Sequence, residues 1–348
     1  MKIVGVILAG GRSNSALTKE KAAAILPVAS YYSAIDFSLS SMVNSGIKKV
    51  AIVTQYISRP LSEHLKSATW WGFGRKHGGL FVLSPMMTAE GHDWYHGTID
   101  ALADTIEFLR ESHEPYVAIA SGDGIYSLDY EKVLKEHIES GAEITVVCKK
   151  LEKENRGRFG IINTDDENRI TSFAEKDESA EGELCSCGIY LARRRTFIEL
   201  IEKAVEEGKR DFVQGVLIPR TQTGRVFAYV HTGYWNNISA DKAYYDCNMD
   251  FLKKEVRDEF FKEDDIIFTR VLDRPPAKYL GGASVSNSLI GSGDIIDGTV
   301  KDSVLFNGVT VGKDAEIIGG IVFPGVSIAP GEKIEKTIVV SENERIKI

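Results

Sequence analysis

The sequence predicts a two-part α/β chain: a mostly parallel sheet fills the first two thirds, and a parallel β-helix follows it. In the first two thirds, apolar runs of strand length alternate with amphipathic stretches, which is the pattern of βαβ units. The last part repeats similar units at a nearly fixed spacing. The chain has 348 residues, of which 43% are hydrophobic and 26% charged, so it is long enough for two domains.

The predicted strands and helices alternate from the N-terminus onward. Helices are expected at the amphipathic stretches 99–109 and 130–138. Ligands of parallel sheets lie beyond the carboxyl ends of the strands, so polar residues and glycines directly after a strand are candidates for a site. The strands are predicted at 4–8, 50–54, 116–120 and 144–147, and the residues that follow three of them are Gly10, Gly11, Gln55 and Asp123.

Repeats mark the C-terminal part. Units that start at Ser288, Ser303, Gly320 and Thr337 are 15, 17 and 17 residues apart, and each has an apolar run and a glycine or polar turn. A period close to three hexapeptides indicates a parallel β-helix of about four coils, in which each coil buries its apolar positions against the next. An antiparallel sandwich is the alternative.

One helix is predicted at 245–261, before a boundary at Pro275-Pro276. The domains expected from this pattern are 1–245, a linker with a helix at 246–280, and the β-helix at 281–348.

Charge and cysteine usage exclude several classes of protein. A net charge of -8 argues against general binding to nucleic acid or to an acidic membrane. The N-terminus reads as neither a signal peptide nor a membrane span, so we expect a cytoplasmic protein. The cysteines are too few and too scattered for a disulfide framework or a zinc site, and we expect them in the core, with Cys185 and Cys187 on one face of a strand at 184–191: they are Cys148, Cys185, Cys187 and Cys247.

Two features of the strand ends point to phosphate chemistry. The turn Ala9-Gly10-Gly11 allows backbone N–H groups to approach a polyphosphate, although an ordinary turn has the same composition. Asp123 follows a strand and a glycine, where a carboxylate suits Mg²⁺; a helix cap or turn is the alternative, and Asp129 fits that alternative well.

The motifs and their order resemble the bacterial ADP-glucose pyrophosphorylase (glucose-1-phosphate adenylyltransferase) family along nearly the whole chain. The matching stretches are Leu8-Ala-Gly-Gly11, Leu17-Thr-Lys19, Ile35-Asp-Phe37, Val43-Asn-Ser-Gly-Ile47, Thr54-Gln-Tyr56, Gly97-Thr-Ile-Asp-Ala101, Ser121-Gly-Asp123, Ile125-Tyr126, 173–176, Gly188-Ile-Tyr190 and Gly233-Tyr-Trp235. The resemblance implies a Rossmann-like nucleotidyltransferase domain followed by a left-handed parallel β-helix. It also implies that a glucose 1-phosphate oxygen attacks the α-phosphate of ATP, with Mg²⁺ and basic side chains stabilising the charge.

The chain departs from that family where charge is needed. The loop at 12–16 is shorter than the family's. An ungapped alignment places Ala23 at the catalytic lysine and Ser33 at a basic position, and neither can carry positive charge. Asn236 and Asn237 stand where the family has a second metal-binding aspartate, and an amide is the weaker ligand for a hard cation. Gly124 replaces a histidine.

The ligand-binding motifs are better preserved. Glu175, Lys176 and Ser186 match the glucose 1-phosphate segment, with Asp177 in place of a proline; a solvated surface lysine is the alternative reading of Lys176. The resemblance further assigns Asp100 to the sugar phosphate and Asp123 to a weak Mg²⁺ site. It assigns a second set to the nucleotide, with Tyr56 beside Gln55 in the base-reading region: Leu8, Ala9, Gly10, Gly11, Gln55, Gly97 and Thr98.

Preserved ligand contacts and lost cations together predict binding without efficient transfer. We therefore expect a GlgD-type subunit that modulates a catalytic GlgC-type subunit in a hetero-oligomer during glycogen synthesis, with ATP or ADP-glucose and glucose 1-phosphate as ligands. A homo-oligomer is the alternative assembly. The alternatives are a self-sufficient enzyme in which Arg12, Lys19 or Lys21 replaces the missing cations, and a purely structural subunit that assembles through its β-helix. An acetyltransferase role is disfavoured because the coils lack an evident catalytic histidine.

Overall fold

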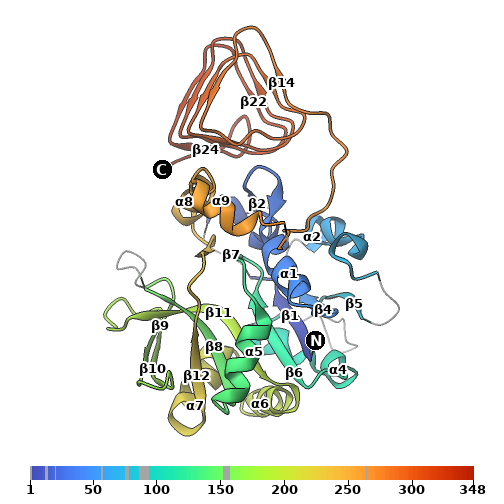
Figure 1. The fold of residues 1–348 in the computed structure, drawn as a ribbon, viewed down its shortest axis with the longest axis vertical. Coiled ribbons are helices and arrows are strands. Elements are labelled where there is room, and N and C mark those ends of the chain that lie inside the picture. Colours follow the sequence, from blue (N-terminus) through green and yellow to red (C-terminus); the bar gives the residue numbers. More distant parts are fainter. Residues whose placement is uncertain are drawn as a thin grey trace.

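The computed structural model describes residues 2–11, 15–19, 21–55, 58–74, 78–85, 94–151, 157–263 and 265–348. Figure 1 shows an α/β part that contains the N-terminus and a prism of stacked coils near the C-terminus. Helices α8 (Asp241–Asp250) and α9 (Lys254–Phe260) lie between the two parts. Within the described ranges, no helix has both the length and the apolar character needed to span a membrane.

The α/β part contains a large, mostly parallel sheet. Its strands are β1 (Ile3–Leu8), β4 (Lys49–Val53), β5 (Gly79–Leu83), β6 (Tyr116–Ser121), β8 (Ile144–Lys150), β9 (Gly160–Thr164), β10 (Ile170–Glu175), β11 (Leu184–Arg193) and β12 (Val226–Val230). Parallel neighbours run in the order β6-β1-β4-β5, and β8 is parallel to β12. Strand β11 joins these two groups and is antiparallel to β6 and to β8. The predicted mostly parallel sheet is thus confirmed.

Helices cover both faces of this sheet because alternate residues of each strand point to opposite sides. Val4 and Val6 of β1 belong to one buried cluster, whereas Ile3 and Ile7 belong to another. The first cluster receives α3 (Thr98–Ala103), α4 (Ile106–Arg110) and α6 (Arg194–Glu206). The second receives α1 (Ala34–Asn44), α2 (Ser58–Leu65) and α5 (Tyr130–Glu139). A further helix, α7 (Ile218–Thr223), contacts β10.

Three short pairings complete the α/β part. Strand β2 (Pro27–Val28) pairs with β3 (Tyr32–Ser33) ahead of α1. Strand β7 (Gly124–Tyr126) pairs antiparallel with β13 (Trp235–Asn237), so Asn237 lies opposite Gly124. This second pairing brings the end of β6 beside a segment more than 100 residues away in the sequence.

The C-terminal part is a parallel β-helix of the left-handed hexapeptide kind. Its strands stack in three sheets, β14-β16-β19-β22, β15-β17-β20-β23 and β18-β21-β24-β25, and their pairings are parallel except that of β25 with β24. The alternative of an antiparallel sandwich is therefore wrong. The bounds are Lys278–Tyr279, Ser284–Ser286, Ile295–Ile296, Thr299–Lys301, Val304–Leu305, Thr310–Val311, Glu316–Ile318, Ile321–Val322, Ser327–Ile328, Lys333–Glu335, Thr337–Val339 and Arg345–Lys347 for β14 to β25 in order.

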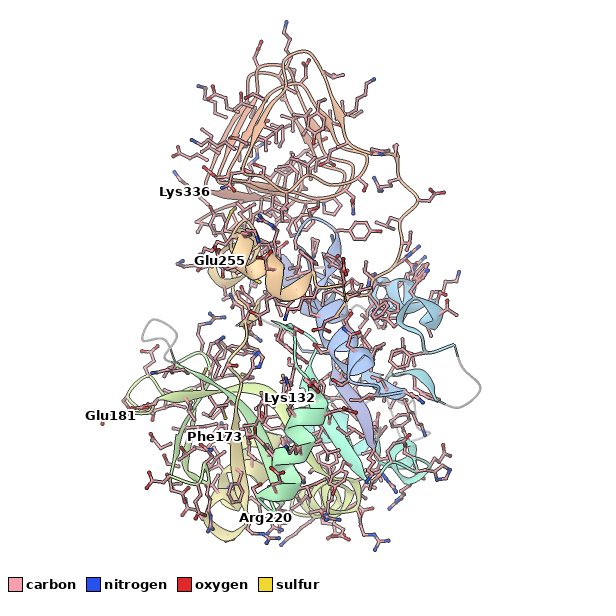
Figure 2. All side chains as sticks on the ribbon, in the orientation of Figure 1. Lys132, Phe173, Glu181, Arg220, Glu255 and Lys336 are labelled. Carbon is pink, nitrogen blue, oxygen red and sulfur yellow. The ribbon has the colours of Figure 1, made fainter. Side chains whose placement is uncertain are left out.

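One hydrophobic cluster joins the two parts. It contains Phe37 of α1, Phe251 and Phe260 beside α8 and α9, and the inward-facing residues of the β-helix coils. Figure 2 shows Lys336 of the β-helix and Glu255 of α9 on the two sides of this contact. The Tyr245 hydroxyl donates a 2.7 Å hydrogen bond to the carbonyl of Gly319, which fixes α8 to a coil.

Two predicted helices are each divided in the structure. The stretch 99–109 forms α3 and α4, which are separated at Asp104 and Thr105, and the stretch 245–261 forms most of α8 together with α9. The predicted shared face for Cys185 and Cys187 depends on side chains that alternate regularly between the two faces of β11. A register shift in β11 between Ser186 and Ile189 interrupts this alternation. All of the chain's cysteines are buried, as predicted.

Candidate functional site

The ends of β1, β4, β6, β10 and β11 surround two adjoining pockets. The first, which we call the charged pocket, encloses about 270 Å³ and is lined by Asp123, Arg158, Glu175 and Lys176 among others. The second, the apolar pocket, encloses about 520 Å³, and its walls include Leu8, Val53, Ala101, Leu102, Ile119 and Phe212. The two pockets share five lining residues, so they form one continuous cleft: Gly11, Ser121, Gly188, Tyr190 and Val213.

The glycine turn after β1 forms the floor where the two pockets meet. A Cβ atom on Gly10 would lie 2.9 Å from the backbone nitrogen of Gln55, so only glycine allows this approach to β4. A Cβ on Gly11 would meet nothing within 4 Å, because that position opens into the cleft. Gln55 lines the apolar pocket and donates a 3.1 Å hydrogen bond to the carbonyl of Tyr95. Tyr56 and Arg12 lie outside the described residues.

The loop before α3 closes the apolar pocket. A Cβ on Gly97 would lie 2.2 Å from the carbonyl oxygen of Arg210, which makes glycine necessary here. The Thr98 hydroxyl accepts a 2.8 Å hydrogen bond from the Phe212 backbone and donates at 3.3 Å to the Asp211 carboxylate. Thr98 and Asp211 therefore present polar atoms at one side of a pocket whose walls include many apolar side chains, an arrangement that suits a ring with a polar edge.

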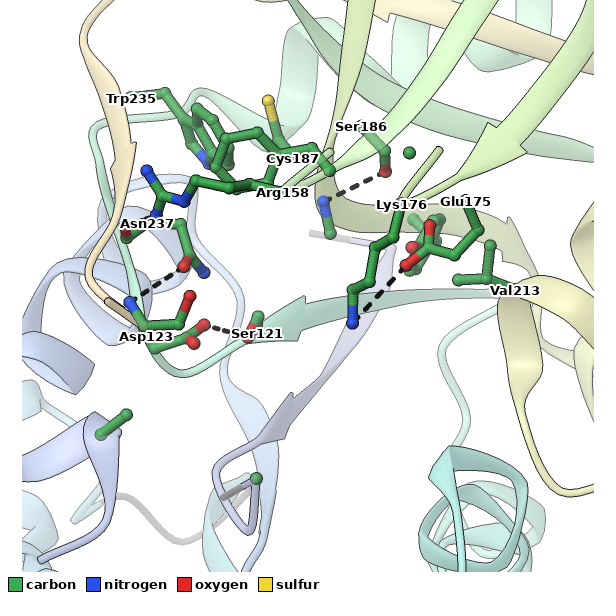
Figure 3. Close-up of a pocket in the computed structure, with 17 residues that line it drawn as sticks. Ser121, Asp123, Arg158, Glu175, Lys176, Ser186, Cys187, Val213, Trp235 and Asn237 are labelled. Atoms are coloured by element: carbon green, nitrogen blue, oxygen red, sulfur yellow. Dashed lines mark hydrogen bonds and ion pairs between the residues drawn. The ribbon is translucent and has the colours of Figure 1, made fainter. Parts of the chain in front are cut away.

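Asp123 lies at the turn between β6 and β7, in the wall of the charged pocket. Its carboxylate accepts a hydrogen bond from the Ser121 hydroxyl, and its carbonyl accepts one from the Ile238 backbone at 3.2 Å. Asn237 lies opposite, and its side-chain oxygen accepts a 3.0 Å hydrogen bond from the Ser239 backbone (Figure 3).

These residues do not form a complete Mg²⁺ site. Magnesium requires octahedral oxygen coordination. In the described ranges, no group of three or more His, Cys, Asp and Glu side chains could hold a metal ion. Asp123 offers one carboxylate, and the neighbouring amide oxygen of Asn237 is already engaged by a backbone N–H. The remaining oxygen ligands would have to come from a bound phosphate or water.

Glu175 and Lys176 form the opposite wall at the end of β10. The Lys176 amine lies 3.9 Å from a Glu175 carboxylate oxygen, and the Lys176 side chain is 69% exposed. Burial raises the pKa of Glu175 above its usual value, against the lowering effect of the neighbouring lysine. Lys176 is thus both well solvated and part of the pocket lining. Ser186, also in that lining, accepts a 3.3 Å hydrogen bond from the Gly188 backbone.

The structure brings most of the predicted site residues into the cleft and leaves three outside it. Ala9 is buried in the core below the sheet end, Asp100 accepts a 2.8 Å hydrogen bond from the His96 backbone, and Ser33 caps α1. The residues that line the cleft are Leu8, Gly10, Gly11, Ala23, Gln55, Gly97, Thr98, Asp123, Glu175, Lys176, Ser186 and Asn237.

The lysines proposed as replacement cations point away from the cleft. The Lys19 amine lies 3.6 Å from Glu344, near the end of the β-helix, and the Lys21 amine lies 5.6 Å from the centre of the Phe323 ring. Neither lysine lines the charged or the apolar pocket. Both lysines face the β-helix instead.

Arg158 is a cation of the charged pocket that sequence reasoning missed. Its guanidinium donates a 2.9 Å hydrogen bond to the carbonyl of Asn237 and lies 4.9 Å from the centre of the Phe159 ring. Burial lowers the pKa of Arg158 from its usual value, while Asp246 and Asp123 act in the opposite direction. The residue is surrounded by charged and glycine residues in the sequence, a pattern typical of a surface loop. Its proximity to Asn237 depends on the pairing of distant segments.

The cleft can bind an anion beside a ring-shaped group. Two cations and two carboxylates line the charged pocket, and the glycine floor leaves room for a phosphate next to the apolar pocket. Ala23 places only a methyl group in the pocket wall, and it is 6% exposed. The arrangement therefore offers groups that can bind a sugar phosphate or a nucleoside phosphate.

Comparisons with known proteins agree with this geometry. The profile of the family described as "Nucleotidyl transferase" matches residues 4–254, and that of "GlmU-like, C-terminal hexapeptide" matches residues 275–347. Over 346 residues, the chain is 37% identical to glucose-1-phosphate adenylyltransferase of Bacillus thuringiensis (strain Al Hakam), an alignment that covers 98% of this chain and 92% of the relative. The proteins of that name from Bacillus anthracis and Bacillus mycoides (strain KBAB4) are 37% and 36% identical, with the same coverage.

Proposed function

The chain belongs to the glucose-1-phosphate adenylyltransferase family of nucleotidyl transferases, and we propose that within this family it is a regulatory subunit of the GlgD type. Its own transfer activity is weak or absent. It binds glucose 1-phosphate in the charged pocket and ATP or ADP-glucose across the apolar pocket. A nucleotide would bring Mg²⁺ on its own phosphates, where the ion would neutralise charge.

The observation that supports this proposal best is the composition of the charged pocket. The methyl group of Ala23 and the amide of Asn237 occupy positions where the family resemblance expects a lysine and an aspartate. Loss of one donor that stabilises transition-state charge typically costs about 10²–10³ in rate. Two such losses leave little turnover, whereas Lys176, Ser186 and the glycine floor remain available for binding.

The chain's own turnover is tested by measuring ADP-glucose formation from ATP, glucose 1-phosphate and Mg²⁺. We expect the natural chain to be slower than a catalytic relative by about three orders of magnitude or more, since two charge-stabilising groups are absent. The double variant Ala23→Lys with Asn237→Asp should recover part of the rate. Lys132→Gln, an exposed change on α5 outside the cleft, serves as the control and should leave the rate of ADP-glucose formation unchanged. Turnover of the natural chain equal to that of a catalytic relative would overturn the proposal.

Regulation is tested separately by mixing the chain with a catalytic subunit. We expect the mixture to differ from the catalytic subunit alone in maximal rate or in its response to effectors, because ligand binding in one subunit biases the other. Unchanged kinetics in a mixture that co-elutes on size exclusion would leave only a structural role. Calorimetry with glucose 1-phosphate distinguishes that role further, since a purely structural subunit has no affinity for this ligand.

A further inference from the structure

The charged pocket contains a cation in a different chemical environment from its lysine. The Lys176 amine faces the Glu175 carboxylate at 3.9 Å, so part of its charge is balanced by its own neighbour. The guanidinium of Arg158 donates a 2.9 Å hydrogen bond to the backbone carbonyl of Asn237, and the Asp246 and Asp123 carboxylates also interact with its charge. Figure 3 shows Arg158 on the Asn237 side of the pocket and Lys176 on the Glu175 side. An anion in the pocket thus has a cation on either side.

Aromatic packing holds the guanidinium in place before any ligand arrives. Arg158 lies against the Phe159 ring, and that ring makes an edge-to-face contact with Trp235 at a centroid distance of 4.9 Å. Trp235 belongs to β13, which is paired with β7 and so is tied to the strand end that carries Asp123. A pre-positioned side chain loses little conformational entropy on binding, and a planar guanidinium matches the geometry of a phosphate.

The same wall offers a hard divalent cation one carboxylate, that of Asp123, in place of the pair that the resemblance expects. The resemblance expects a carboxylate at position 237, yet the chain has an amide there whose oxygen is engaged by the Ser239 backbone. The Asn237 carbonyl, a second oxygen at this position, accepts the Arg158 guanidinium. Positive charge at this wall is therefore supplied by a side chain.

We propose that Arg158 and Lys176 hold the phosphate of a sugar phosphate between them, and that this binding requires no divalent cation. The inference rests on the proposed function, because it takes glucose 1-phosphate, a phosphate monoester, as the ligand. The guanidinium carries its charge at every physiological pH and donates in the plane of its fork. It thus takes over the charge neutralisation that a metal ion provides in a site with two aspartates.

Calorimetric titration with glucose 1-phosphate, in buffer with EDTA and in buffer with Mg²⁺, tests the inference. The natural chain should bind with the same Kd within about twofold in both buffers. Arg158→Gln should weaken binding by about tenfold or more, because it removes a charged hydrogen-bond donor from the phosphate. Arg158→Lys should restore part of the affinity through its charge. Lys132→Gln, the same change of charge on an exposed surface, should bind as the natural chain does.

Asn237→Asp provides the converse test. A carboxylate at position 237 beside Asp123 would create a pair of metal ligands, so binding by this variant should become stronger in Mg²⁺ than in EDTA. Thermal melts of every variant establish that the fold is retained.

The outcomes separate the inference from the proposed function. Binding by the natural chain that disappears in EDTA, or an Arg158→Gln variant with unchanged affinity, overturns the inference and leaves the regulatory proposal standing. No binding in either buffer overturns both the inference and the ligand assigned to the subunit.

Discussion

Lys176 combines a binding role with a backbone conformation that residues other than glycine seldom adopt. Its φ is +54°, in the left-handed region, immediately after β10 ends at Glu175. This conformation costs an L-amino acid about 1–2 kcal/mol because Cβ crowds the following carbonyl oxygen. Strained backbone of this kind concentrates at functional sites, where the surrounding structure imposes it. Here it turns the lysine into the pocket lining.

A matched pair of substitutions separates the strain at Lys176 from the charge. Lys176→Gly and Lys176→Ala both remove the amine, so both should weaken glucose 1-phosphate binding to the same extent in calorimetry. Lys176→Gly also relieves the strain, so we expect it to be more stable to urea than Lys176→Ala by about 1 kcal/mol. Equal or greater stability of the alanine variant would contradict the left-handed conformation.

At the residue scale, the sequence predicts those site residues that directly follow a strand. Gly11, Gln55 and Asp123 line the cleft because the carboxyl ends of β1, β4 and β6 meet at one edge of the sheet. Asp129 caps α5, the role that the sequence favours for this aspartate, and its carboxylate accepts hydrogen bonds from the Glu131 and Lys132 backbones. Arg158 and Asp211 could not be predicted, since contacts between segments distant in the sequence bring them to the cleft.

At the scale of single elements, α5 packs a histidine into the core against β6 and β8. His137 is 2% exposed, its Nδ1 lies 2.8 Å from the Thr145 hydroxyl, and its ring meets Tyr116 edge-on at 5.5 Å. Its Nε2 has no hydrogen-bond partner in the described part of the chain. Burial, with a contribution from Arg193, lowers the pKa of His137 to about 4. The folded protein therefore holds this imidazole neutral.

This histidine should make the fold sensitive to acid. Its pKa is about 6.5 in the unfolded chain and about 4 in the folded chain, so the unfolded state binds the proton more readily as pH falls. The stability linked to neutral His137 is complete above pH 6.5 and is lost as pH falls toward 4. Between pH 7 and 5 we expect the free energy of unfolding to fall by about 2 kcal/mol from this group. Urea unfolding of the natural chain and of His137→Gln at both pH values checks this; equal pH dependence in the two proteins would contradict it.

The boundaries of elements depend on contacts that hydrophobic periodicity does not reveal. The helix predicted at 99–109 is divided between Ala103 and Ile106, and the Thr105 hydroxyl donates to the Leu102 carbonyl at this division. The helix predicted at 245–261 is interrupted after Asp250, where Phe251 is fully buried in the cluster shared with the β-helix. The amphipathic pattern is continuous through both breaks, so tertiary packing decides them.

At the scale of the whole molecule, the shared hydrophobic cluster predicts that the two parts unfold together. The Phe323 ring of the β-helix meets the Tyr244 ring of α8 at a centroid distance of 5.8 Å and the Phe306 ring at 6.0 Å. Each of these aromatic residues is at most 1% exposed. A core that crosses between two parts couples their stabilities. The repeat spacing predicts the β-helix, but nothing in the sequence indicates that residues of the β-helix pack with residues of α8 and α9 in one hydrophobic cluster.

Tryptophan fluorescence can measure this coupling because all four tryptophans of the chain precede residue 236. Phe323→Ala leaves a cavity in the β-helix and should cost about 3–5 kcal/mol. We expect it to lower the urea midpoint reported by tryptophan fluorescence as much as that reported by far-ultraviolet circular dichroism. Ile318→Ala, an outward-facing change on the same coils with 42% exposure, is the control. A fluorescence midpoint that Phe323→Ala leaves in place would mean that the two parts unfold independently.

The antiparallel strand β25 covers an edge of the β-helix to which a further parallel coil could otherwise be added. A stack of parallel coils is a template on which a further coil of the same shape can be laid, and open strand edges invite such addition. The chain reverses after β24 and lays residues Arg345–Lys347 along Thr337–Val339 in the opposite sense. On the face formed by β24, the neighbouring strand is therefore antiparallel, whereas a further coil would need a parallel strand. Strand β25 therefore covers one strand edge of this coil and limits self-addition there to the faces that β25 does not cover.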